Sequence, residues 1–346
     1  MIFTLAHRYL FMLLALLFAL APIVSPLAAE PEDELSFDDA PLESSLHYPA
    51  WFRLSFLHLQ EDLQDARTFG KRGLIVYFGQ AYCPYCKALI EGNFGMRDIA
   101  QYTRKYFDVV AIDIHGTKQV TDFNGEVLSE KEYAAREKVN FTPTLIFYDS
   151  EGREALRLQG YHPPYKFRAA LEYVADGYYR EESLREYLER ANPPLSFEPD
   201  GLNQEDFFAS PPYALDRTRI PGSTPLLVFF EQGKCHACDV LHSAPLQNQE
   251  IQKLLSRFEN VQLDVLADSA VITPEGERTT SRAWAEKLGL FYTPTLMFFN
   301  EHGKEIIRVD SVVGFYRLRK VLEYVLSGAY RQGITLQQYR RSTGGE

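Results

Sequence analysis

Cysteine is scarce in this chain, and no cysteine remains to form a structural disulfide. The 346 residues include four cysteines, and all four lie in two short motifs, CPYC at Cys83–Cys86 and CHAC at Cys235–Cys238. This distribution does not suit a scaffold held together by structural disulfides. Two thiols separated by two residues can instead close a disulfide across the first turn of a helix. The motifs therefore point to thiol–disulfide chemistry.

An excess of basic residues is also missing. The chain carries 36 Lys and Arg against 47 Asp and Glu, a net charge of −11, which argues against a general nucleic-acid-binding face. No glycine-rich motif for a pyridine nucleotide or a flavin is present. We therefore expect no nucleic-acid partner, and no cofactor other than redox-active disulfides.

A long apolar run occurs once, at the N-terminus. His7 and Arg8 are followed by Tyr9–Ala29, which contains no charged residue. This pattern predicts a secretory signal peptide over residues 1–29, with small residues at its end for cleavage. The run also has the length of a membrane span, so an uncleaved anchor is the alternative. Both interpretations predict a periplasmic or otherwise exported protein, in which residues 30–50 form a flexible acidic leader.

The rest of the chain is an internal duplication. Leu74–Phe78 recurs as Leu226–Phe230, a shift of 152 positions, and the CxxC motif recurs with the same shift, from 83 to 235. Thr-Pro-Thr at 142–144 recurs 151 positions later, at 293–295. A register kept to within one residue over a domain-sized length predicts two globular domains and not a solenoid. The expected boundaries are 51–190 for the first domain, 191–224 for a Pro-containing linker and 225–342 for the second domain.

Apolar periodicity predicts alternating β and α elements in these domains. At the start of the first domain we expect a helix from Trp51 to about Gly70, with Leu54 and Leu57 on its apolar stripe and no clear counterpart in the second domain. The other strands expected there are 74–78, 109–114, 145–148 and 155–158, and the other helices are 131–138 and 165–175. This alternation is that of an α/β fold.

The position of each CxxC, between a strand and a helix, assigns a role to each cysteine. The start of a helix carries a partial positive charge, which favours the thiolate of the first cysteine. We expect Cys83 and Cys235 to be the nucleophiles that form a mixed disulfide, and Cys86 and Cys238 to be the resolving thiols. The alternative is one zinc site with four thiolate ligands. It is disfavoured because each pair belongs to its own repeat, with its own downstream Thr-Pro.

The order of strand, CxxC, helix and Thr-Pro before a strand resembles the thioredoxin fold. The resemblance implies two tandem domains, in each of which a central mixed sheet is flanked by helices. It further implies that Pro143 and Pro294 are cis and lie against the CxxC motifs. The backbone of Thr142 and Thr293 would then pair, strand-like, with a substrate peptide. An ordinary trans proline at a strand edge is the alternative.

Over residues 52–180 the first domain is more narrowly similar to the SoxW-like, thioredoxin-related periplasmic proteins. The likeness rests on the segments 82–87, 121–125, 141–144 and 160–161. It implies a reductase of protein disulfides. Because the sequence has no pyridine-nucleotide or flavin motif, we expect such a reductase to take its electrons from a membrane thiol donor. The residues themselves fit exchange with protein thiols or disulfides in either direction. A disulfide oxidase or isomerase is therefore an alternative, and so is a second domain that serves as a binding module.

The neighbours of the cysteines modulate this chemistry. The dipeptide Pro84-Tyr85 sets the redox poise of the first motif. His236, when protonated, stabilises the adjacent thiolate of the second motif, unless it is an exposed side chain without effect. Thioredoxins carry a buried acid six residues before the first cysteine, and Tyr77 and Phe229 stand at those positions here. Another carboxylate, water or the substrate must therefore accept the proton of the resolving thiol.

Overall fold

The structure is a computed structural model that describes residues 38–191 and 201–343. The predicted signal peptide (1–29), the first part of the predicted leader (30–37) and residues 192–200 of the predicted linker lie outside the described residues. In the part of the chain that is described, no helix is both long and apolar enough to cross a membrane.

The first domain is built on a mixed four-stranded sheet with the strand order β2-β1-β5-β6. β1 (Gly73–Gly79) runs parallel to β2 (Phe107–Asp113) and antiparallel to β5 (Thr144–Asp149), which pairs with β6 (Glu154–Gln159). Every residue of β1 is buried. The uninterrupted apolar sequence of β1 is that of a central strand covered on both faces.

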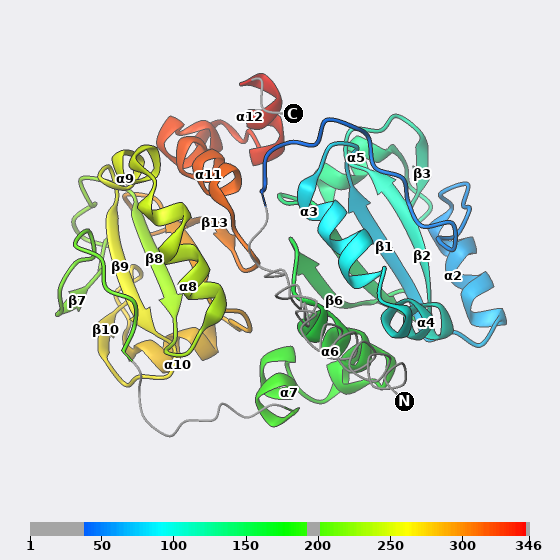
Figure 1. The fold of residues 1–346 in the computed structure, drawn as a ribbon, viewed down its shortest axis with the longest axis horizontal. Coiled ribbons are helices and arrows are strands. Elements are labelled where there is room, and N and C mark those ends of the chain that lie inside the picture. Colours follow the sequence, from blue (N-terminus) through cyan, green and yellow to red (C-terminus); the bar gives the residue numbers. More distant parts are fainter. Residues whose placement is uncertain (1–37, 192–200, 344–346) are drawn as a thin grey trace, which may run out of the picture. The chain divides into compact units, whose positions relative to one another are not determined.

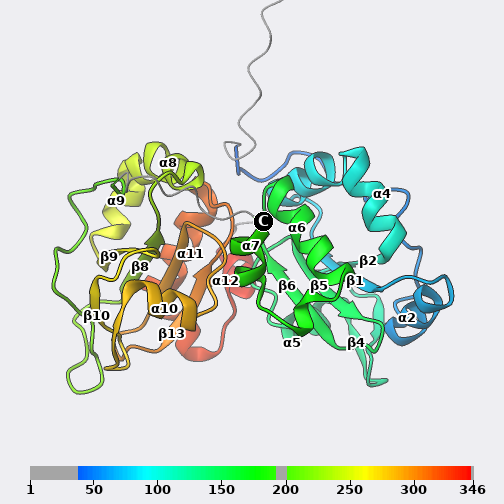
Figure 2. The same cartoon turned by 90° about the horizontal axis from the view of Figure 1, so that it is seen from below.

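Helices cover both faces of this sheet (Figure 1). The side chains of β1 alternate between two cores, so that Ile75 and Tyr77 enter one and Leu74 and Val76 enter the other. In the turned view of Figure 2, α5 and α6 lie on opposite sides of β5 and β6. One core is closed by α3 (Pro84–Lys87), α4 (Arg97–Tyr106) and α6 (Pro164–Ala175), and the other by α2 (Leu59–Thr68) and α5 (Glu130–Arg136).

Short elements complete the first domain. The turn of α3 continues directly as the π-helix η2 (Ala88–Asn93). A small hairpin of β3 (Gln119–Thr121) and β4 (Val127–Ser129) occupies the stretch before α5. The domain ends with η3 (Tyr178–Arg180) and α7 (Leu184–Ala191).

The second domain repeats this architecture. Its main sheet has the order β13-β12-β8-β9, which is the equivalent order read from the other edge. The strands are β8 (Leu226–Glu231), β9 (Glu259–Asp264), β12 (Thr295–Phe299) and β13 (Glu305–Val309). β8 is parallel to β9 and antiparallel to β12, as β1 is to β2 and β5. The duplication predicted from the sequence is therefore a duplication of the fold.

The second sheet is also covered on both faces, and α8 and α10 lie on opposite sides of it (Figure 2). Its helices are α8 (His236–Ser243), α9 (Gln249–Leu255), α10 (Ser281–Lys287), α11 (Phe315–Ser327) and α12 (Leu336–Ser342), with the 3-10 turns η4 (Pro245–Gln247) and η5 (Ala329–Gln332). A second, small sheet joins β7 (Tyr213–Ala214), β10 (Ala270–Ile272) and β11 (Arg278–Thr280).

The predicted helix from Trp51 is wrong over its first half. α2 begins only at Leu59, and Leu54, which we placed on the apolar stripe, is 98% exposed. The backbone N–H of Arg53 donates to the carbonyl of Val109 in β2 (2.8 Å), and the Arg53 side chain donates to Asp62 of α2 (2.7 Å). These bonds hold the segment against the sheet in a non-helical path, so tertiary contacts override the helical periodicity.

Candidate active site

The first CxxC lies where the chain leaves β1 and enters α3. Cys83 is the N-cap residue of α3, and the backbone N–H of Cys86 donates to its Sγ over 3.0 Å. Pro84 occupies the first turn, where its missing N–H costs no helical bond. Cys83 and Cys86 form a disulfide. In the reduced state the same N–H group and the helix start would stabilise a thiolate on Cys83.

The Thr-Pro segment of the first domain lies directly beside this disulfide. The Thr142–Pro143 peptide bond is cis, as the resemblance implied. The Sγ of Cys83 is 3.3 Å from the hydroxyl oxygen of Thr142 and 3.6 Å from its carbonyl oxygen. Residues 59 positions apart in the chain, at 83 and 142, are thus brought into contact by β1 and β5.

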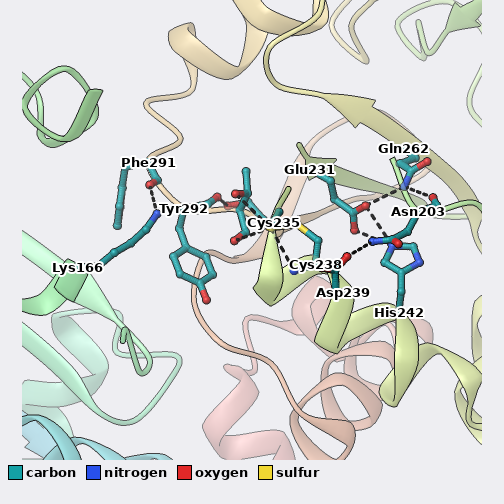
Figure 3. Close-up of a disulfide and its surroundings, with 12 residues drawn as sticks. Lys166, Asn203, Glu231, Cys235, Cys238, Asp239, His242, Gln262, Phe291 and Tyr292 are labelled. Atoms are coloured by element: carbon teal, nitrogen blue, oxygen red, sulfur yellow. Dashed lines mark hydrogen bonds and ion pairs between the residues drawn. A yellow bond between two sulfur atoms is a disulfide. The ribbon is translucent and has the colours of Figure 1, made fainter. Parts of the chain in front are cut away.

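The second domain repeats this geometry. Cys235 is the N-cap residue of α8, its Sγ accepts the N–H of Cys238 (3.1 Å), and the two cysteines form a disulfide (Figure 3). The Thr293–Pro294 peptide bond is cis, and the Sγ of Cys235 lies 3.6 Å from both oxygens of Thr293. Each CxxC is closed on itself, so the four sulfurs do not form a single four-thiolate site. Among the described residues, no group of three or more His, Cys, Asp or Glu could hold a metal ion.

The residues between the cysteines differ in the two sites. Tyr85 is buried, and its hydroxyl donates to Asp39 (2.7 Å) and accepts the N–H of Gly314 (2.7 Å). Burial raises the pKa of Tyr85 far above its usual value, so the ring stays neutral. His236, in contrast, is exposed at the start of α8.

A buried polar network in the second domain was not predicted from the sequence. Glu231, the last residue of β8, is 0% exposed, and its carboxylate lies 3.1 Å from Nε2 of His242 on α8. Gln262 donates to the same carboxylate (2.8 Å), and Glu205 lies 2.9 Å from Nδ1 of His242. Figure 3 shows the Glu231 carboxylate facing the His242 ring.

This network sets the charge of the imidazole. Burial acts to lower the pKa of His242, but the hydrogen bonds and opposite charges of Glu231 and Glu205 outweigh it and raise the pKa. His242 follows Cys238 by four positions on α8, which places the two side chains on one face of the helix. The sequence signal was a single glutamate closing the apolar run LLVFFE, and the first domain has Gly79 at that position.

The comparisons with known proteins agree with this fold. The family described as "Thioredoxin-like domain" matches the chain twice, over residues 59–175 and 212–326. No match was found among curated proteins.

Three solved structures are similar to parts of the chain. A thioredoxin-fold protein from Helicobacter pylori is 23% identical, covers 40% of this chain and 91% of its own, and has a TM-score of 0.35. A thioredoxin from Thermus thermophilus is 25% identical, with coverages of 34% and 83% and a TM-score of 0.28. A DsbH oxidoreductase is 16% identical, with coverages of 38% and 92% and a TM-score of 0.27.

The two family matches together span more than half of the chain, and each contains one CxxC disulfide at the start of a helix. Such a disulfide, beside a cis-proline in this fold, is the redox centre of a thiol–disulfide oxidoreductase. The protein is therefore an enzyme of this type and belongs to the thioredoxin-like family.

Proposed function

We propose that the protein is an exported reductase of protein disulfides, related to the SoxW-like proteins, with its redox centres at Cys83–Cys86 and Cys235–Cys238. The observation that carries the proposal is the pairing of each nucleophile with a threonine carbonyl. A sulfur placed 3.6 Å from the Thr142 carbonyl can attack a disulfide in a peptide strand that pairs with the same backbone. Thr142-Pro143 and Thr293-Pro294 would thus bind substrate.

The reaction balances within one domain. The Cys83 thiolate attacks one sulfur of the substrate disulfide, a new S–S bond forms, and the other substrate sulfur leaves as a thiolate that takes up a proton. Cys86 then loses its proton and attacks Cys83. This step forms the Cys83–Cys86 disulfide and releases the second substrate thiol. The substrate gains two electrons and two protons, and the CxxC loses them.

The two domains differ in what can accept the proton of the resolving thiol. Tyr77 and Phe229 occupy the position of the usual buried acid, and both are buried core residues without a carboxylate. In the second domain, the buried Glu231 and its partner His242 supply a carboxylate and an imidazole on the strand and helix that flank the CxxC. We expect this pair to serve the second site, while water or substrate serves the first.

The direction of exchange rests on the SoxW likeness and on the predicted N-terminal signal, which would place the chain in an oxidising compartment. A reductase there needs a membrane thiol donor to restore its dithiol. The test is rapid acid quenching of cells, alkylation of free thiols and peptide mass spectrometry of each CxxC. A mainly reduced Cys83–Cys86 supports the reductase. A mainly oxidised pair supports an oxidase or isomerase instead.

A turnover assay tests which domain works. Reduction of insulin disulfides by the full chain is compared with that by Cys83→Ser and by Cys235→Ser. If Cys235→Ser turns over as the wild type does, the second domain is a binding module. If Cys83→Ser keeps full activity, the first site is not the catalytic one.

A further inference from the structure

Arg317 of the second domain reaches into the redox site of the first. It lies near the start of α11, and its guanidinium carbon is 3.3 Å from the centroid of the Tyr85 ring, inside the first CxxC. Its Nη2 donates to the carbonyl of Thr142 over 2.9 Å. This is the carbonyl that a substrate strand would need. Arg317 therefore occupies a substrate-binding acceptor of the first site.

Asp39 fixes this contact from a third segment. Its carboxylate accepts the Tyr85 hydroxyl (2.7 Å) and the backbone N–H groups of Tyr316 and Arg317 (2.9 Å each). The side chain is buried. One residue of the leader thus ties the first CxxC to the N-terminal end of α11, where the partial positive charge of the helix favours a carboxylate.

The equivalent residue of the first domain lies beside the second site. Lys166 and Arg317 are counterparts in the repeat, since 166 plus 151 is 317. Lys166 donates to the carbonyl of Phe291 (3.1 Å, Figure 3) and its Nζ lies 4.9 Å from the ring centroid of Tyr292, just before the Thr-Pro of the second site. Arg317 lies 5.3 Å from the ring of Phe141, the counterpart of Tyr292.

Equivalent residues of the two domains also meet each other. The N–H of Val312 donates to the carbonyl of Tyr161, and 161 plus 151 is 312. Their neighbours Gly160 and Ser311 approach so closely that a Cβ added to Gly160 would lie 2.1 Å from the Ser311 hydroxyl oxygen. Contacts between equivalent positions are those of a two-fold interface. The repeats pack on each other as a homodimer would, around their redox sites.

Neither nucleophile is open to solvent in this arrangement: Cys83 is 1% exposed and Cys235 is 7% exposed. Attack on a protein disulfide requires access to these sulfurs. Resting on the exchange function proposed above, we propose that the two domains mask each other's redox site, with Arg317 in the place of substrate backbone at the first site and Lys166 beside the Thr-Pro segment of the second. Exchange with a protein then requires the domains to separate.

The test is the rate at which the cysteines of the reduced full chain react with N-ethylmaleimide, scored at Cys83 by peptide mass spectrometry. Arg317→Ala should increase the alkylation rate of Cys83 about tenfold, which corresponds to a loss of about 1.4 kcal/mol in the free energy that favours the closed arrangement of the domains. Asp39 lies outside both domain cores, and Asp39→Ala should also increase the alkylation rate of Cys83. The matched control is Arg319→Ala, on the same helix, because its ion pairs with Glu250 and Glu323 lie within the second domain. It should leave the rate unchanged.

Equal Cys83 rates in the wild type, Arg317→Ala and Asp39→Ala would overturn the masking. Insulin reduction by the same proteins tests the proposed reductase function independently of the masking proposal. Faster alkylation in the two variants without any insulin reduction supports masking and refutes the reductase. Insulin reduction with identical alkylation rates in all proteins supports the reductase and refutes masking.

Discussion

The buried Glu231–His242 pair gives a prediction whose size and sign follow from the structure. Glu231→Gln keeps the shape of the side chain but removes its charge, so His242 loses one of its two carboxylate partners. A buried hydrogen bond to a charged group contributes about 1.5–3 kcal/mol. We therefore expect the free energy of unfolding of the second domain to fall by about that amount at pH 5.5.

The pH dependence identifies the imidazole as the cause. Because the folded protein raises the pKa of His242, its stabilising contribution is complete below the unfolded value of 6.5 and is lost as the pH rises through the folded pKa. The loss caused by Glu231→Gln should accordingly be largest in acid and shrink toward pH 9. An NMR titration should show the pKa of His242 lowered in the variant.

Urea unfolding at several pH values measures the stability of this variant, with the exposed Glu275→Gln as the control. The unfolding of the first domain should not change, because Gly79 stands at the equivalent position there. An unaltered pKa of His242 in Glu231→Gln, or a stability loss independent of pH, would refute the inference that Glu231 raises the pKa of His242.

Two further predictions concern the redox centre and the domain interface. When reduced Cys86→Ser is mixed with a disulfide-containing protein substrate, it should accumulate a mixed disulfide between Cys83 and the substrate, visible on a non-reducing gel. Cys83→Ser should trap no substrate at the first site; the opposite result would exchange the roles of the two cysteines. His162 is buried against the rings of Phe291 and Tyr292, and burial, with Lys166 and Arg317 nearby, lowers its pKa from 6.5 to about 3. Its neutral form stabilises the closed chain above pH 6.5, and up to about 1.4 kcal/mol should be lost per pH unit below that value. As the closed chain loses stability below pH 6.5, Cys83 should become more accessible to alkylation. His162→Phe should weaken this pH dependence of the Cys83 alkylation rate, and the same pH dependence in the variant and the wild type would contradict this role of His162.

The redox centres could be read from the sequence because their signals are local. A CxxC after an apolar strand places the first sulfur at a helix start whatever surrounds it, and the structure has Cys83 and Cys235 at N-caps. The cis form of Pro143 and Pro294 came from the family resemblance and is confirmed. The strands of the first sheet also lie within one or two residues of their predicted bounds.

The parts that failed depend on contacts between distant segments. Leu54 fits a helical stripe by its spacing, but the backbone bond from Arg53 to Val109 decides its path. Glu231 and His242 are 11 positions apart, and only the packing of α8 against β8 makes them a pair. The periodicity of a sequence reflects only which residues share a face of one element, so it carries no information about partners on other elements.

The duplication in the sequence explains part of the interface between the two repeats but not all of it. Equal folds predict equal sites, and Lys166 and Arg317 each contact the opposite domain beside its Thr-Pro segment from equivalent positions. The symmetry is broken by Asp39, which precedes the first domain and ties the Arg317 end of the interface but not the Lys166 end. The first site therefore has Asp39 as an additional charged anchor, and its nucleophile is the less exposed of the two. If the two domains separate by hinging about the Asp39 anchor, the Lys166 end should open first, and Cys235 should react with N-ethylmaleimide before Cys83; equal rates at the two cysteines would contradict this order.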